Sequence, residues 1–158
     1  MKQVIFFLML IFVFQSCEKK KDRVVSVHEN VKFEELKQLN LDKAYDNLLN
    51  PNLSTDEEYT KILNSWQKFH AKVNTVLKEN GFSWDAKTPS VTIVNKVYFN
   101  SEGKVNYLIA NILNDVVTKA KKDEYVKLLS ENINKLSIDL KRDHQFAQCG
   151  KVKYKNHE

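Results

Sequence analysis

The hydrophobic positions of the chain fall into segments that differ in their spacing. The first segment is an unbroken apolar run, VIFFLMLIFVF, at positions 4–14. Helical spacing of three and four residues recurs in 30–49, 55–80 and 123–136. Alternating, β-branched or aromatic positions mark 90–100, 104–113 and 145–154. After the apolar run, the pattern therefore predicts the element order α-α-β-β-α-β.

The clearest predicted helix covers residues 55–80. Ser54 is the expected N-cap, and Glu57 stands three residues later, where it completes a capping box. Gly81 fits the position after the last turn, where a left-handed residue ends many helices. The segment 30–49 carries the same spacing over a shorter length and predicts one or two short helices.

The first two β segments are expected to form a hairpin. A turn with the sequence NSEG at positions 100–103 separates them, and a left-handed glycine there predicts a type I turn with a bulge. This register pairs Phe99 with Val105. It also pairs Val97 with Tyr107, so that all four side chains share one face.

The predicted fold class is α+β, with N-terminal helices followed by a hairpin, a helix and a strand. Strands and helices must share one core, so we expect a small antiparallel sheet with helices on one face. Residues 30–158 would form one domain. Residues 18–29 are typical of a polar tether, although their three valines could instead form a short edge strand. Gly150 is a candidate bulge in the last strand.

The N-terminal segment has the features of an export signal. Lys2 precedes eleven apolar residues, which is typical of a signal peptide and too few for a membrane span of about 20 residues. Ser16 and Cys17 follow, and the stretch Phe14-Gln15-Ser16-Cys17 resembles a relaxed lipobox of bacterial lipoproteins, as in Bacteroidetes. The alternatives are an ordinary secretory signal and an uncleaved anchor.

The lipobox resemblance implies how the protein is processed and where it resides. Residues 1–16 would be a signal peptide, Cys17 would carry a diacylglyceryl group, and residues 17–29 would be a lipid-anchored tether. The exported protein would then lie at the cell membrane or the outer membrane. Two or three acyl chains would hold it there stably.

Residues 91–155 are similar in element order to the C-terminal domain of TonB-type proteins. The similarity rests on Asn100-Ser101-Glu102-Gly103-Lys104 and on Gly150-Lys151-Val152. It implies a fold that binds a partner by adding a strand at a sheet edge. The sequence has no counterpart of the Pro-rich spacer of that family, so energy transduction is not implied.

Charge adds one candidate surface. The chain has 25 basic and 20 acidic residues and a formal net charge of +5. Lys151, Lys153 and Lys155 alternate in the last β segment, so one face of that strand should be cationic. These lysines could bind an acidic envelope protein or another anionic surface, or they could guard an edge strand against aggregation. Export argues against nucleic acid as a partner.

Catalytic and cofactor-binding patterns do not emerge from the sequence. The histidines form no HExxH motif, and there is no CxxC, GxGxxG, P-loop or GxSxG, so no catalytic, metal or cofactor site is predicted. His70 should lie at the edge of an apolar helix face. His144 and Cys149 are an odd number of residues apart, which places them on opposite faces of a continuous strand.

The sequence thus predicts a lipid-anchored envelope protein that acts as a binding or assembly module. Whether it is an enzyme is left open. One alternative is an envelope hydrolase whose site is assembled from scattered residues. Another is an inhibitor or self-protection lipoprotein that blocks a second protein.

Overall fold

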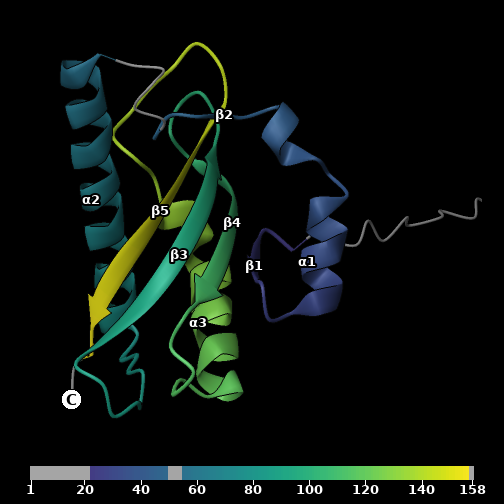
Figure 1. The fold of residues 1–158 in the computed structure, drawn as a ribbon, viewed down its shortest axis with the longest axis vertical. Helices are drawn as coiled ribbons and strands as arrows, with labels where there is room; N and C mark the ends of the chain where they lie inside the picture. The colour runs from purple at the N-terminus through teal and green to yellow at the C-terminus, as the bar shows by residue number, and fades with distance from the viewer. Residues whose placement is uncertain (1–21, 50–54, 157–158) are drawn as a thin grey trace, which may run out of the picture.

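A computed structural model describes residues 22–49 and 55–156. The described elements are five strands and three α-helices, with short 3-10 turns (Figure 1). The strands are β1 (Val24–Ser26), β2 (Asp46–Asn47), β3 (Ser90–Phe99), β4 (Val105–Ile112) and β5 (Phe146–Lys155). The helices are α1 (Asn30–Lys37), α2 (Asp56–Glu79) and α3 (Lys119–Asn132), and the 3-10 turns are η1 (Leu41–Lys43) and η3 (Ile133–Lys135).

The strands form one mixed sheet in the order β1-β4-β3-β5-β2. The three long strands are antiparallel, whereas β1 is parallel to β4 and β2 is parallel to β5. The α+β class is therefore confirmed, but the predicted antiparallel sheet is wrong at both edges. The predicted order is also wrong, because β1 precedes α1 and β2 lies between the N-terminal helices and α2. Both edge strands are too short to show a period of their own.

The N-cap of helix α2 is Thr55, one residue later than the predicted cap at Ser54. The Thr55 hydroxyl accepts a hydrogen bond from the Glu58 amide at 3.3 Å, so the Thr55/Glu58 pair has the spacing that we assigned to Ser54 and Glu57. Ser54 itself lies outside the described residues. At the other end Gly81 has φ of 65°, which confirms the predicted left-handed stop.

The β3–β4 hairpin is confirmed, but its register shifts next to the turn. Phe99 pairs with Val105 as predicted. A bulge between Tyr98 and Phe99 then pairs Val97 with Leu108 instead of Tyr107. The prediction that Tyr107 shares a face with the other three side chains is therefore wrong, because a one-residue slip reverses the face of every side chain beyond it.

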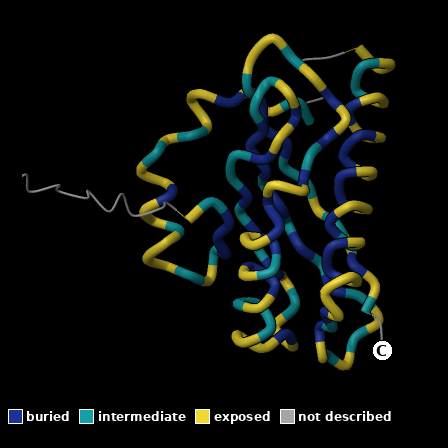
Figure 2. Tube along the Cα trace, turned by 180° about the vertical axis from the view of Figure 1, so that it is seen from behind, coloured by how far each residue is buried: buried dark blue, intermediate teal, exposed yellow. Residues whose placement is uncertain are grey.

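The main core lies between the sheet and the helices α2 and α3, where Figure 2 shows buried backbone along the long strands. Among its fully buried side chains are Phe69, Phe99, Tyr125, Leu129 and Phe146. A smaller cluster on the opposite face joins Tyr45 to Tyr98 and Ala147, with Leu41 of η1 packed against it. Segment 41–45 thus covers part of that face. The expectation that all helices lie on one face of the sheet therefore holds only for α2 and α3.

Strand β1 lies at one edge of the sheet. Part of the segment 18–29 therefore forms the short edge strand that the sequence analysis gave as the alternative to a tether. Val24 and Val25 are buried, and β1 pairs with β4. The Arg23 guanidinium donates from Nε to the Asn106 carbonyl at 2.9 Å and also bonds the Val105 carbonyl. Any tether must therefore end before residue 23. In the described ranges, no helix is long and apolar enough to cross a membrane.

Candidate partner-binding groove

The outer edge of β5 is largely uncovered. Strand β2 pairs only with Phe146 and Ala147, and the Leu48 amide donates to the Ala147 carbonyl at 2.9 Å. Beyond this point, no strand among the described residues pairs with this side of β5. Residues 149–155 are called the free edge from here on. Such an edge presents unpaired backbone donors and acceptors that a further strand can bind.

Two hydrogen bonds show which backbone groups point outward. The Asn156 amide donates to the Pro89 carbonyl at 3.0 Å, at the end of the β3 ladder, while the Ala147 carbonyl accepts from the opposite side. Pairing between β3 and β5 is continuous, and backbone direction alternates along a strand. The amides and carbonyls of Lys151, Lys153 and Lys155 therefore point away from β3.

Continuous pairing also corrects the expectation of a bulge at Gly150, which pairs directly with Asn95. The glycine is needed for another reason. A Cβ atom at position 150 would lie 2.8 Å from Nε1 of Trp66. Gly150 thus lets the indole of α2 pack closely against β5.

A groove of about 580 Å³ runs between the free edge and α2. This volume lies in the range of about 300–1,000 Å³ that is usual for ligand sites. Its walls are Leu63, Trp66, Gln67, His70, Ala71, Asn74 and Lys78 of α2 and residues 151–155 of β5. We call it the β5–α2 groove.

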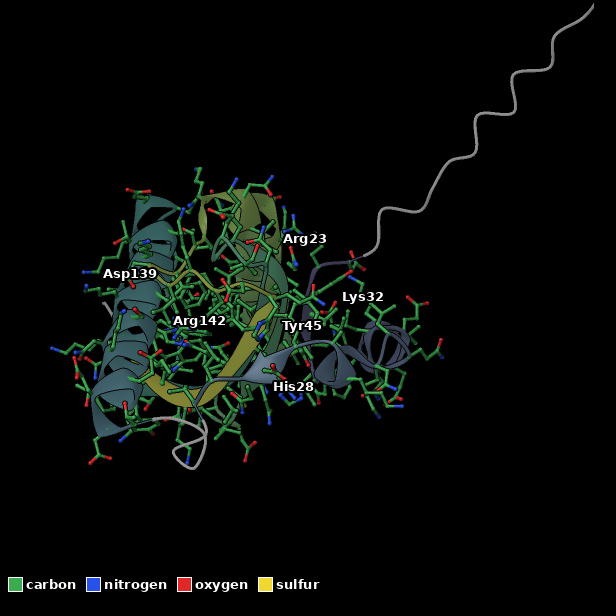
Figure 3. The ribbon with its side chains drawn as sticks, turned by 90° about the horizontal axis from the view of Figure 1, so that it is seen from above. Arg23, His28, Lys32, Tyr45, Asp139 and Arg142 are labelled. Carbon is green, nitrogen blue, oxygen red and sulfur yellow. The ribbon has the colours of Figure 1, made fainter. Side chains whose placement is uncertain are left out.

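The opposite flank of α2 is fixed to the loop that leads into β5. The Lys68 ammonium lies 3.0 Å from a carboxylate oxygen of Asp139, and Arg142 forms an ion pair with Glu58. Figure 3 shows Asp139 and Arg142 beside α2. The Lys72 ammonium donates to the Ser137 carbonyl at 2.9 Å. These contacts hold α2 from one side and leave its groove-lining flank open.

The two faces of the free edge differ in chemistry. Val152 pairs with Ile93, which is fully buried in the core, so Val152 faces the helices. Lys151, Lys153 and Lys155 lie on the other face and are exposed. The predicted cationic face is therefore confirmed, and it lies beside the uncovered backbone.

The described walls of the groove carry charge of one sign. Among the residues that the structure describes, they include four lysines, namely Lys78 and the three of the free edge, and no carboxylate. The ion pairs of the described chain do not include any of these lysines. The groove is thus electropositive, with ammonium groups available to an anionic partner.

Neutral polar groups form the floor of the groove. Nδ1 of His70 lies 2.6 Å from the Tyr154 hydroxyl, and the Trp66 ring meets the imidazole edge-on with ring centroids 4.2 Å apart. Burial lowers the pKa of His70 to about 3 and raises the pKa of Tyr154 well above its usual value. Neither group changes its charge near neutral pH, so the pair is unsuited to acid–base catalysis there. The position of His70 agrees with its predicted place at the edge of the apolar face.

The burial of His70 predicts a loss of stability in mild acid. The unfolded imidazole takes up a proton near pH 6.5 and the folded one only near pH 3, so the unfolded state binds more protons between these values. We expect the free energy of unfolding to fall by about 1.5 kcal/mol between pH 6.5 and 5.0. Urea titrations at both pH values would measure this change. The His70→Gln variant should lack it, and an equal fall in that variant would contradict the assignment.

A second hollow, of about 370 Å³, lies between residues 33–42 and the open face of the sheet. Lys96 and Asp42 form an ion pair in it, with the ammonium 2.6 Å from a carboxylate oxygen. The Tyr98 hydroxyl donates a hydrogen bond to the same carboxylate at 2.8 Å. Lys96 hydrogen-bonded to Asp42 is the main reason that the pKa of this carboxyl is lowered. This internal pairing makes the hollow a weaker candidate than the groove.

The other candidates from the sequence are not brought together. His144 precedes β5 and lies 3.1 Å from an Asp46 carboxylate oxygen. Burial raises the pKa of the half-buried Cys149 thiol, which disfavours a nucleophilic thiolate. Cys17 lies outside the described residues. In the part of the chain that the structure describes, no cluster of His, Cys, Asp and Glu could hold a metal ion.

The contribution of α2 to the groove was missed at the sequence level. Leu63, Gln67 and Asn74 lie on one flank of α2, but polar and apolar types are mixed on that flank, as on an ordinary solvated surface. A usable signal was Gly150, because a glycine inside a strand indicates close approach of another group. Comparisons of the chain with protein-family models, curated proteins and solved structures gave no match.

Proposed function

We propose that this protein is a lipid-anchored envelope protein that binds a partner protein by pairing one of its strands with the free edge of β5. The observation that carries the proposal is the uncovered backbone of residues 149–155 beside the β5–α2 groove. In strand addition, main-chain hydrogen bonds supply affinity, and pockets for alternate side chains supply specificity. Here the free edge supplies the main-chain hydrogen-bonding groups, and the groove supplies the pocket for side chains.

The position of the anchor is compatible with this use of the sheet. Strand β1 lies at one edge, and the free edge belongs to β5 on the other side of β3 and β4. The six residues from Cys17 to Asp22 span at most about 20 Å when fully extended. A lipid on Cys17 would therefore hold the start of β1 within about 20 Å of the membrane, and this strand lies on the opposite side of the sheet from the free edge.

The same surface would serve an inhibitor or self-protection lipoprotein, in which case the partner is the protein that it blocks. A hydrolase would need a titratable group active near neutral pH. The groove instead holds the neutral pair of His70 and Tyr154 on its floor. Partner binding therefore has the better structural support.

The test requires a substitution that blocks strand addition and keeps β5 in place. Deleting residues 145–158 is unsuitable, because it removes Phe146 and Tyr154 from the core. Lys153→Pro removes one outward amide and leaves the ladder with β3 intact. Lys153→Ser removes the same charge but keeps the amide, which makes it the matched control.

We expect a photo-crosslinking residue at Gln67, inside the groove, to capture a discrete partner protein in living cells. Lys153→Pro should abolish this adduct, and Lys153→Ser should retain most of it. The same crosslinker at Val31, which is 75% exposed on α1, should give no such adduct. Adducts that persist in a folded Lys153→Pro variant, as judged by circular dichroism, would place the binding surface elsewhere.

A further inference from the structure

We infer that the partner segment bound at the free edge is an extended stretch of about five to seven residues in which acidic and small apolar side chains alternate. This inference rests on the proposed strand addition and adds the chemistry of the occupant. The length follows from the free edge, since residues 149–155 extend over about 20 Å at a strand rise of about 3.3 Å.

Alternation follows from the position of the groove. A strand paired with β5 continues the pleat of the sheet, so its side chains point in turn toward the helices and toward the open face. Those on the helix side enter the β5–α2 groove, and those on the open face lie beside Lys151, Lys153 and Lys155. One occupant therefore meets two different environments at successive residues.

The open-face positions call for carboxylates. Three exposed ammonium groups follow one another at every second residue, and the part of the groove wall that the structure describes carries no acidic side chain. A second copy of this chain would bring its own lysines against them, which is how edge lysines prevent self-association. The same lysines that disfavour a second copy thus favour an acidic strand.

The helix-side positions call for small or medium apolar side chains. Leu63 is 37% exposed at the groove wall, and Ala71 and Val152 also line the groove. Below them, His70 is neutral and its Nδ1 is already bonded to Tyr154. Helix α2 contributes one ammonium group to the groove walls, that of Lys78. A charged side chain placed over Leu63 or His70 would lose hydration without gaining an opposite charge, whereas an apolar one would cover Leu63.

Synthetic peptides can test this pattern on the protein purified in detergent. The probe is the acetylated peptide Glu-Val-Glu-Val-Glu-Val-Glu. Its controls are the peptide with Gln in place of every Glu and the block isomer Glu-Glu-Glu-Glu-Val-Val-Val. We expect the probe to bind about tenfold more tightly than either control at low salt. Each ion pair between a Glu side chain of the probe and Lys151, Lys153 or Lys155 contributes only modestly, because it is exposed to solvent. Binding should weaken as salt is added.

Charge reversal provides the matched variant. In the triple variant Lys151→Glu, Lys153→Glu and Lys155→Glu, the preference should switch to the peptide Lys-Val-Lys-Val-Lys-Val-Lys. Lys153→Pro should weaken every peptide, because it removes a backbone donor that all of them use. Circular dichroism of each variant shows whether β5 is still folded.

The outcomes separate the two proposals. Equal binding of the acidic and Gln peptides, with both weakened by Lys153→Pro, would overturn the acidic partner and leave strand addition standing. Equal binding of the block isomer would overturn alternation in the same way. If no peptide binds while vesicles containing anionic phosphatidylglycerol bind equally well to wild type and to Lys153→Pro, the lysines act on a membrane surface, and both proposals fail.

Discussion

Replacing Gly103 with alanine is expected to lower the free energy of unfolding by about 3 kcal/mol, from left-handed strain and from steric overlap. Gly103 has φ of 78°, which an L-residue adopts only with strain. A Cβ atom there would also lie 2.5 Å from the Ile138 carbonyl oxygen and 2.6 Å from that of Leu140. Both obstacles are backbone atoms, so the clash cannot be relieved by a side-chain rotation.

The matched control is Gly81→Ala at the end of α2. Gly81 has a similar φ of 65°, but a Cβ atom there meets nothing within 4 Å. The free energy of unfolding of this variant should fall by only about 1 kcal/mol, the cost of the left-handed backbone conformation. Urea denaturation of both variants measures the difference. Equal losses would mean that the β3–β4 turn does not pack against the 138–140 loop as described.

If the lipid-anchor proposal holds, replacing Cys17 with serine is expected to abolish fatty-acid labelling and to block processing before residue 17. The serine cannot carry the thioether-linked diacylglyceryl group that the lipobox resemblance implies, and cleavage before Cys17 depends on that group in this family. The unprocessed variant keeps the apolar run at 4–14, so its larger size, and not its sedimentation alone, reports the loss of the lipid. Metabolic labelling with a fatty acid and the electrophoretic mobility of the protein would measure both effects.

The chain has a natural control for this experiment. Cys149 is its other cysteine and lies half-buried in β5. Cys149→Ser should retain the label and the membrane association, because only Cys17 lies at the end of the apolar run. If wild type takes up no label and the Cys17→Ser protein is processed and sedimented normally, the lipid-anchor proposal is wrong.

Long, regular segments were predictable from the sequence, because local patterns determine them. The period of α2, the left-handed glycines at 81 and 103, and the pairing of Phe99 with Val105 all agree with the structure. Each depends on the interactions of a few neighbouring residues. The register shift next to Tyr98, where Asn106 of β4 is the extra residue, was not predictable, since nothing local indicates which residue of a strand is extra.

The sheet edges could not be predicted for a different reason. Strands β1 and β2 have three and two residues, so neither shows a hydrophobic period. Their parallel pairing is decided by contacts far along the chain, such as Val24 with Leu108 and Asp46 with Phe146. Tertiary context determines such short strands, because their own residues contribute little preference.

The candidate site was partly visible in the sequence. Alternation of Lys151, Lys153 and Lys155 predicted a cationic strand face, which the structure confirms. The groove beside it depends on how α2 crosses β5, and on Gly150 admitting Trp66. Such packing between distant segments gives no repeating pattern in the sequence. The residues of α2 that line the groove could therefore not be identified from it.

Amide hydrogen exchange in the protein without any ligand tests the central claim, that the outer edge of β5 is free. The inward amides of Val152 and Tyr154 should be protected by the ladder with β3, while the outward amides of Lys151 and Lys153 should exchange rapidly. Nuclear magnetic resonance resolves these four amides individually. Fast exchange at the two lysines and slow exchange at their neighbours is the predicted result. Equal protection at all four would show that the edge is already covered and would contradict strand addition.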